Sequence, residues 1–156
     1  MEKSIDVANY FLQNWGDISP MKLIKLTYIA HGWHLGIIES PLIDENAEAW
    51  KYGPVIPSLY HKYKIFGGNS ISFGYDHPVK FQDEKVKDLL NKIWEVYGGL
   101  TGVQLSAKTH KEGTPWSITW DNVKKTGAMS LQISDDLIKS YYQSLMISNQ
   151  TETENA

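Results

Sequence analysis

The chain has 156 residues, of which 42% are hydrophobic, and a formal net charge of −3. This length and composition are typical of one globular domain, and the charge gives no bulk electrostatic reason to bind DNA or RNA. The absence of cysteine excludes disulfides, a cysteine nucleophile and the usual thiolate zinc site. The N-terminal residues alternate charged and apolar groups and lack the apolar run of a signal peptide, so we expect a cytoplasmic protein.

Two helices are predicted at the start of the chain. The first runs from a cap at Ser4 to a stop at Gly16. The second covers 19–38 and begins with a Ser-Pro pair, which suits an N-cap followed by the first helical position. Its apolar residues fall on two adjacent stripes, which is typical of a central, buried helix. The stripes are Leu23, Leu26, Ala30, Trp33 and Ile37, and Ile24, Tyr28, His31, Leu35 and Ile38.

Two further features of this central helix bear on packing and chemistry. Gly32 and Gly36 leave one face bare, so that another backbone can approach closely there. His31 and His34 stand three apart and could reach one ion, but they lack the spacing and the glutamate of a zinc protease motif. We therefore expect no metal and no cofactor, and interpret the pair as one packed or hydrogen-bonded histidine beside a surface one.

The middle of the chain is predicted to hold a small β element. A helical turn is an equally good interpretation of Ala49 and Trp50. In chain order we expect strands over 42–43 and 47–52, a Gly-Pro turn at 53–54, a helix from Pro57 to the glycines at 67–68, and a strand over 71–73.

The second half is predicted to be helical, with one short extended segment. We expect a helix from a cap at Asp83 to Gly98, a short helix over 100–108, a loop before a helical turn capped by Thr114, an extended segment over 129–133, and a last helix capped by Ser134. No repeat or linker interrupts the chain. The predicted fold is mainly α with a small β element (α+β), a compact single domain over 1–147, followed by a polar, disordered tail over 148–156.

No catalytic constellation is evident in the sequence. There is no GxSxG nucleophile elbow and no phosphate-binding loop. The adjacent carboxylates at 44–45 and 135–136 do not have the arrangement of an acid and base pair, and the second pair suits the start of a helix. We therefore predict that the protein is not an enzyme.

Two segments are richer in aromatic and turn residues than the composition requires. AWKYGPVIPSLY, over 49–60, surrounds two prolines and a glycine with large aromatic side chains. THKEGTPW, over 109–116, places polar residues before a capped turn. Each segment suits either a partner-binding surface or scaffolding of the fold. His110 is interpreted as a loop hydrogen-bonding residue, with a proton carrier in an unrecognised site as the other reading.

Three blocks, in this order and spacing, carry a resemblance to a known family. They are PMKLIKLTYIAHGWHLG, EAWKYGPVIPSLY and LSAKTHKEGTPW. Together they resemble the Panacea antitoxin domain, also called the SocA-like or phage-associated family, from about Ile18 to Tyr142. The matching signature positions are Ala49, Trp50, Gly53, Pro54 and Val55, then Thr109, His110, Pro115 and Trp116.

The resemblance implies an antitoxin that neutralises a cognate toxin by binding it, with the toxin encoded beside it and no enzymatic activity. Some larger members carry a DNA-binding module, for which these 156 residues leave no room. An adaptor that delivers a bound partner to a protease is the alternative, and a small metal- or histidine-dependent hydrolase is a more distant one. We expect no membrane and no nucleic-acid partner. The predicted partner-binding residues are Trp50, Tyr52, Tyr60, His110, Lys111, Glu112 and Trp116.

Overall fold

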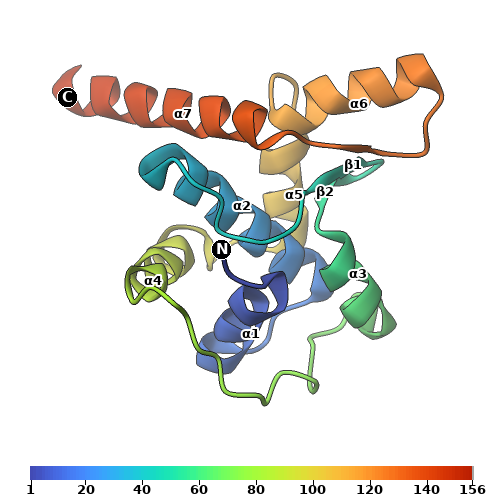
Figure 1. Ribbon diagram of the computed structural model, residues 1–156, viewed down its shortest axis with the longest axis vertical. Coiled ribbons are helices and arrows are strands. Elements are labelled where there is room, and N and C mark those ends of the chain that lie inside the picture. The colour runs from blue at the N-terminus through green and yellow to red at the C-terminus, as the bar shows by residue number, and fades with distance from the viewer. Residues whose placement is uncertain (156) are drawn as a thin grey trace.

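A computed structural model describes residues 1–155, with side chains as far as Asn149. The described elements confirm a mainly helical α+β domain with one small sheet (Figure 1). In chain order they are α1 (Ser4–Trp15), α2 (Pro20–Ile38), β1 (Glu48–Trp50), β2 (Gly53–Val55), α3 (Pro57–Tyr63), the 3-10 helix η1 (Lys64–Phe66), α4 (Lys85–Tyr97), α5 (Gly102–His110), α6 (Pro115–Thr126), β3 (Leu131–Gln132) and α7 (Asp135–Asn155). No described helix has the length and apolarity that crossing a membrane requires.

Helix α2 is the central element, as its two apolar stripes predict. It contacts α1, α3, α4, α5 and α7, which surround it on different sides (Figure 1). The Ser19 hydroxyl accepts a hydrogen bond from the backbone N–H of Lys22, so the predicted cap is confirmed. The stripes fail in the last turn, where Ile37 and Ile38 are 54% and 47% exposed, and Trp33 is only partly buried. That turn lies at the surface of the domain.

The bare face of α2 receives helix α7. A Cβ added to Gly32 would lie 2.2 Å from Cε2 of Tyr142, and one added to Gly36 would lie 3.4 Å from the backbone carbonyl carbon of the same residue. Trp33 flanks this contact with an edge-to-face ring contact to Tyr142 at 5.1 Å. The close backbone approach predicted from the two glycines is therefore confirmed, and Tyr142 occupies the space that side chains would need.

Gly32→Ala is expected to lower the free energy of unfolding by about 1–3 kcal/mol through overpacking, even though alanine adds up to about 1 kcal/mol of helix propensity. Urea unfolding monitored by circular dichroism measures the change. The matched control is the same substitution in a Tyr142→Leu background, where the ring is gone and the cost is expected to shrink. A Gly32→Ala protein at least as stable as the original would contradict the α2–α7 packing.

The small sheet has the strand order β2-β1-β3, with both pairings antiparallel. Trp50 pairs with Gly53, so the hairpin turn falls at Lys51 and Tyr52. The prediction of a turn at 53–54 is wrong, because Gly53 and Pro54 belong to β2. The extended segment predicted around 129–133 is confirmed by β3, which pairs with the other side of β1.

Three local predictions are wrong near the first helix and after η1. Lys3, and not Ser4, is the N-cap residue of α1, and the Ser4 hydroxyl is buried inside the helix without a hydrogen-bond partner. Residues 42–43 form only an isolated bridge, between Ile43 and Glu2. Residues 71–73 form no strand, since Ile71 makes a single backbone hydrogen bond to Ile18 and no neighbouring strand lies beside it.

The C-terminal helices begin where the capping residues predict. Thr114 caps α6, and the Ser134 hydroxyl accepts from the N–H of Leu137 at the start of α7. Thr109 and His110 form the end of α5, so the predicted loop shrinks to 111–114. Helix α7 continues to Asn155, into the segment 148–156 for which we predict a disordered tail; its last residue and the side chains from 150 on lie outside the described residues.

Candidate functional site

The hairpin formed by β1 and β2 is held by side chains from three different helices. Each side chain donates one hydrogen bond to a backbone carbonyl, and the three acceptors are at alternate positions along the hairpin. The bonds run from Nε1 of Trp116 to Trp50 at 2.6 Å, from Oγ of Ser106 to Tyr52 at 2.9 Å, and from Nζ of Lys25 to Pro54 at 2.8 Å. Because side chains from three helices hold its carbonyls, the backbone of the hairpin is fixed relative to α2, α5 and α6.

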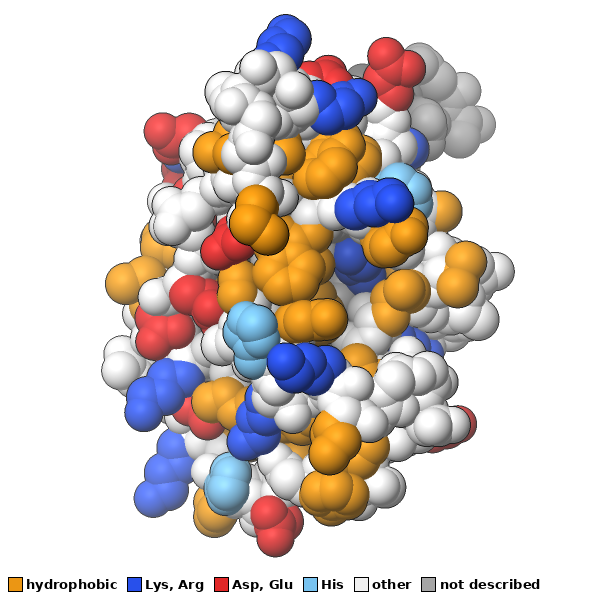
Figure 2. Space-filling model, turned by 90° about the vertical axis from the view of Figure 1, so that its right-hand side faces the viewer, with side chains coloured by type: hydrophobic (Ala, Val, Ile, Leu, Met, Phe, Trp, Pro, Cys, Tyr) orange, Lys and Arg blue, Asp and Glu red, His pale blue; other side chains and the backbone are white. Residues whose placement is uncertain are grey.

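A largely apolar groove of about 550 Å³ lies between this hairpin, the start of α2 and α3 with η1. Its volume is within the range typical of binding sites. Figure 2 shows hydrophobic side chains gathered on this side of the molecule beside a hollow, with lysine side chains around them. The lining residues are Pro20, Met21, Ile24, Lys25, Trp50, Lys51, Tyr52, Val55, Tyr60, Lys64 and Gly67.

Three of the predicted partner-binding residues meet in this groove. Trp50 and Tyr60 pack edge to face with their ring centroids 4.9 Å apart. Tyr52 stands at the hairpin turn, 70% exposed, with the amino group of Lys51 5.5 Å from its ring centroid. Exposed tyrosine rings that are positioned by their neighbours are typical anchors of protein interfaces.

His110 and Trp116 lie behind the hairpin rather than in the groove. Trp116 is 8% exposed and stacks on Trp120, with ring centroids 5.7 Å apart. The His110 and Trp116 rings form a T-shaped pair with their centroids 5.5 Å apart, and Nδ1 of His110 donates to the backbone carbonyl of Ser106. Both residues therefore support the hairpin, and direct contact with a partner stays a prediction for them.

Lys111 and Glu112 lie outside the groove, in the short loop between α5 and α6. Both are exposed. The Lys111 side chain lines a different, smaller pocket together with Thr114 and residues of α2 and α7. The seven predicted partner-binding residues therefore fall into three groups: three line the groove, two lie behind the hairpin, and two lie in the α5–α6 loop.

Lys25 is a groove residue that sequence reasoning did not find. Its side chain is 4% exposed, and burial lowers the pKa of its amino group to about 8. The same amino group lies 2.9 Å from where a Cβ of residue Gly53 would stand. The sequence does contain one indication of this role, because Lys25 lies between the apolar residues Ile24 and Leu26 on a helix predicted to be buried. A buried amino group needs a hydrogen-bond acceptor nearby.

The two histidines of α2 are part of a structural network. His31 is fully buried; its Nδ1 accepts from the N–H of Leu42 at 3.3 Å and its Nε2 donates to Asp135 at 3.0 Å. Nδ1 of His34 donates to the carbonyl of Ser40 at 2.6 Å. Both rings are buried, so the expectation of one surface histidine is wrong. Together they join α2 to the segment after it and to the start of α7.

Comparison with known proteins decides the family. The antitoxin SocA-like, Panacea domain family matches residues 23–117, which include the hairpin, most of the groove and the start of α6. The chain belongs to the SocA-like Panacea domain family. It is also similar to the protein named Antitoxin SocA from Caulobacter vibrioides (strain NA1000 / CB15N), with 27% identity over 139 residues, covering 81% of this chain and 72% of the relative. No solved structure matches.

Membership of the Panacea family supports an antitoxin role and therefore a toxin as partner. It also suggests a role other than catalysis. The matched range ends at residue 117, so the last helix, α7, and most of α6 lie beyond the match. The groove lies within or directly beside the matched residues, which makes it the first surface to consider for the partner.

Proposed function

We propose that this Panacea domain neutralises a cognate toxin, encoded beside it, by direct protein–protein contact at the groove and hairpin. The observation that supports this most strongly is the pre-formed aromatic groove beside a hairpin whose carbonyls are held by α2, α5 and α6. A surface fixed before binding loses little conformational entropy when the partner docks.

The chemistry of the groove suits a partner segment that is apolar at its centre and acidic at its edge. Met21, Trp50 and Tyr60 supply apolar and aromatic contact area from α2, β1 and α3. Lys51 and Lys64 lie at the groove as well, and both are exposed. Exposed lysines speed association with an acidic partner, while the buried aromatic contacts set the lifetime of the complex.

Tyr52→Ala is expected to leave the fold intact and to weaken toxin binding by about 30-fold, the effect of a residue worth about 2 kcal/mol at an interface. The side chain is exposed at a turn whose hydrogen bonds use its backbone only, so its loss leaves no cavity. Isothermal titration calorimetry of the purified protein with the toxin encoded beside it measures the affinity.

The matched control is Val103→Ala, which removes a side chain that is 72% exposed on α5 and does not line the groove. Its affinity for the toxin should equal that of the unchanged protein. A folded Tyr52→Ala protein that binds the toxin as tightly as Val103→Ala would remove the hairpin turn from the interface. A toxin that stays active when bound, and whose level falls in cells that make this chain, would favour the adaptor function instead.

A further inference from the structure

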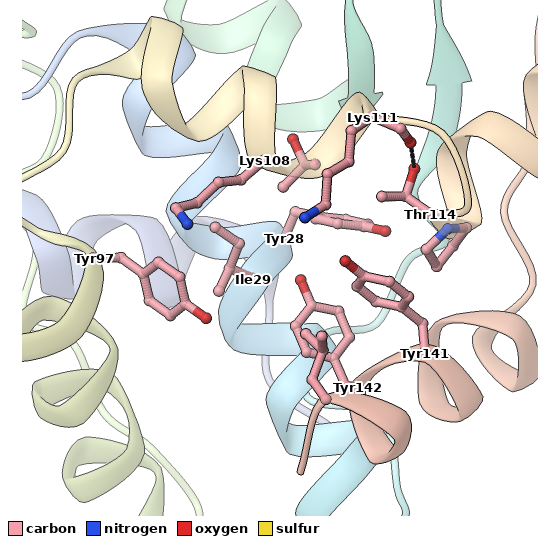
Figure 3. A pocket seen from close by; sticks show the side chains of 11 residues that line it. Tyr28, Ile29, Tyr97, Lys108, Lys111, Thr114, Tyr141 and Tyr142 are labelled. Carbon is pink, nitrogen blue, oxygen red and sulfur yellow. Dashed lines mark hydrogen bonds between the residues drawn. The ribbon is translucent and has the colours of Figure 1, made fainter. Parts of the chain in front are cut away.

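A second pocket lies away from the groove, where α7 crosses α2. It is small, about 130 Å³, well below the roughly 300–1,000 Å³ of sites for drug-sized ligands. Its walls come from α2, the end of α4, the end of α5, the α5–α6 loop, the start of α6, and α7 (Figure 3). The polar side chains that line it are Tyr28, Tyr97, Lys108, Thr109, Lys111, Thr114, Tyr141 and Tyr142.

Four tyrosine hydroxyls face this pocket. Figure 3 shows the hydroxyl ends of Tyr28, Tyr97, Tyr141 and Tyr142 around one space, although the four rings come from three helices. Tyr28 is 2% exposed, and its hydroxyl is buried without a hydrogen-bond partner. An unpaired buried hydroxyl is costly, so its position at this pocket points to a partner that occupies the space.

The hydroxyls are available as hydrogen-bond donors. The Tyr97 oxygen accepts a hydrogen bond from Nε1 of Trp33 at 2.9 Å, which leaves its own proton free to donate. Burial raises the pKa of Tyr28, Tyr97, Tyr141 and Tyr142. Neighbouring tyrosines raise the pKa of Tyr28, Tyr141 and Tyr142 further, whereas the hydrogen bond from Trp33 partly offsets the effect of burial on Tyr97. All four therefore keep their protons near neutral pH.

Two lysines complete the pocket from the side of α5. Figure 3 shows both lysine side chains along one side of the pocket, with the ammonium group of Lys108 toward Tyr97 and that of Lys111 toward Tyr28. No carboxylate among the described residues lines the pocket or forms an ion pair with either lysine. The backbone of Lys111 is fixed by the Thr114 hydroxyl, which donates to its carbonyl at 2.7 Å. The ammonium groups of Lys108 and Lys111 therefore share the pocket with hydroxyl donors and with no carboxylate of the described residues.

We infer that this pocket binds a phosphate group, either as the free ion or as the end of a small phosphate ester. Two ammonium groups match the charge of a phosphate dianion, and donors on several sides match its tetrahedral oxygens better than the two oxygens of a carboxylate. Helix α6 begins at the rim with Thr114 and Pro115, so the positive end of its dipole adds to the attraction. The volume admits one such group and excludes a nucleoside inside the pocket.

The test is a titration of the purified full chain with inorganic phosphate, and separately with glycerol phosphate, followed by amide NMR shifts at constant ionic strength. We expect saturable 1:1 binding, with the largest shifts at the end of α5, in the middle of α2 and around Tyr141–Leu145 of α7. Lys108→Gln and Lys111→Gln should each weaken binding at least 10-fold, and Lys125→Gln, an exposed lysine on α6, should not. Tyr28→Phe should weaken binding while raising the melting temperature of the unliganded protein.

The two ligands identify the source of the group. Binding of inorganic phosphate supports the free ion, and binding of glycerol phosphate alone supports an ester. The inference is overturned if neither ligand shifts these amides beyond what chloride does at the same ionic strength. It is also overturned if acetate binds as tightly as phosphate, or if the Lys108 and Lys111 variants bind like Lys125→Gln.

Discussion

Trp116→Ala is expected to lower the free energy of unfolding by about 3–5 kcal/mol, the usual cost of deleting a large buried aromatic side chain. The ring is 8% exposed, stacks on Trp120 and makes a T-shaped contact with the His110 ring. Its Nε1 also donates the hydrogen bond that holds the carbonyl of Trp50. The substitution therefore opens a cavity and releases one of the three supports of the hairpin, so toxin binding should fail as well.

Urea unfolding followed by circular dichroism measures this loss, and calorimetry with the toxin measures the binding. Ile118→Ala is the matched control, since Ile118 is on the same helix and 46% exposed. It should change the free energy of unfolding by less than about 1 kcal/mol. A Trp116→Ala protein as stable as Ile118→Ala would show that the Trp116 side chain does not stabilise the hairpin.

Gly53→Val is expected to cost about 3 kcal/mol or more, because two separate effects add. Gly53 has φ of 123°, a conformation that a β-branched residue adopts only with strain. A Cβ there would also lie 2.9 Å from Nζ of Lys25, so the new side chain displaces the amino group that holds Pro54. The hairpin should loosen and toxin binding should weaken together with stability.

Gly113→Val separates the two effects. Gly113 also has a positive φ, 87°, but no atom lies within 4 Å of an added Cβ. It should carry the backbone strain without the collision, and therefore destabilise the protein less than Gly53→Val in the same urea experiment. Equal losses for the two variants would contradict the role assigned to Lys25.

The starts of α2, α6 and α7 were predictable because their signals are local, whereas the predicted caps Ser4 and Asp83 are not the N-cap residues of α1 and α4. Ser19, Thr114 and Ser134 each accept a hydrogen bond from a backbone N–H three residues on, so a short stretch of sequence contains the whole interaction. The bare face of α2 was predictable for a similar reason, since two glycines four apart leave room for any helix. Nothing in that pattern names Tyr142 as the residue that fills it.

The candidate site was predictable only in part, because its geometry depends on distant contacts. The hairpin turn shifts from the Gly-Pro pair to Lys51 and Tyr52, and Gly53 is held against Lys25, 28 positions earlier in the chain. The aromatic residues of the hairpin and α3 were found because they are close in sequence. The α2 side of the groove was missed, since its residues meet the hairpin and α3 only in the folded chain. The tyrosine pocket was missed because its residues converge only when α2, α4, α5 and α7 pack together.

The most direct test of the proposed function is the activity of the purified toxin in a mixture that contains this protein and no protease. Direct neutralisation predicts that toxin activity falls to background at a fixed molar ratio of the two proteins. It also predicts that Tyr52→Ala, folded by circular dichroism, requires a higher concentration for the same inhibition, while Val103→Ala does not. Full toxin activity in the presence of an excess of the folded protein would contradict neutralisation by direct binding.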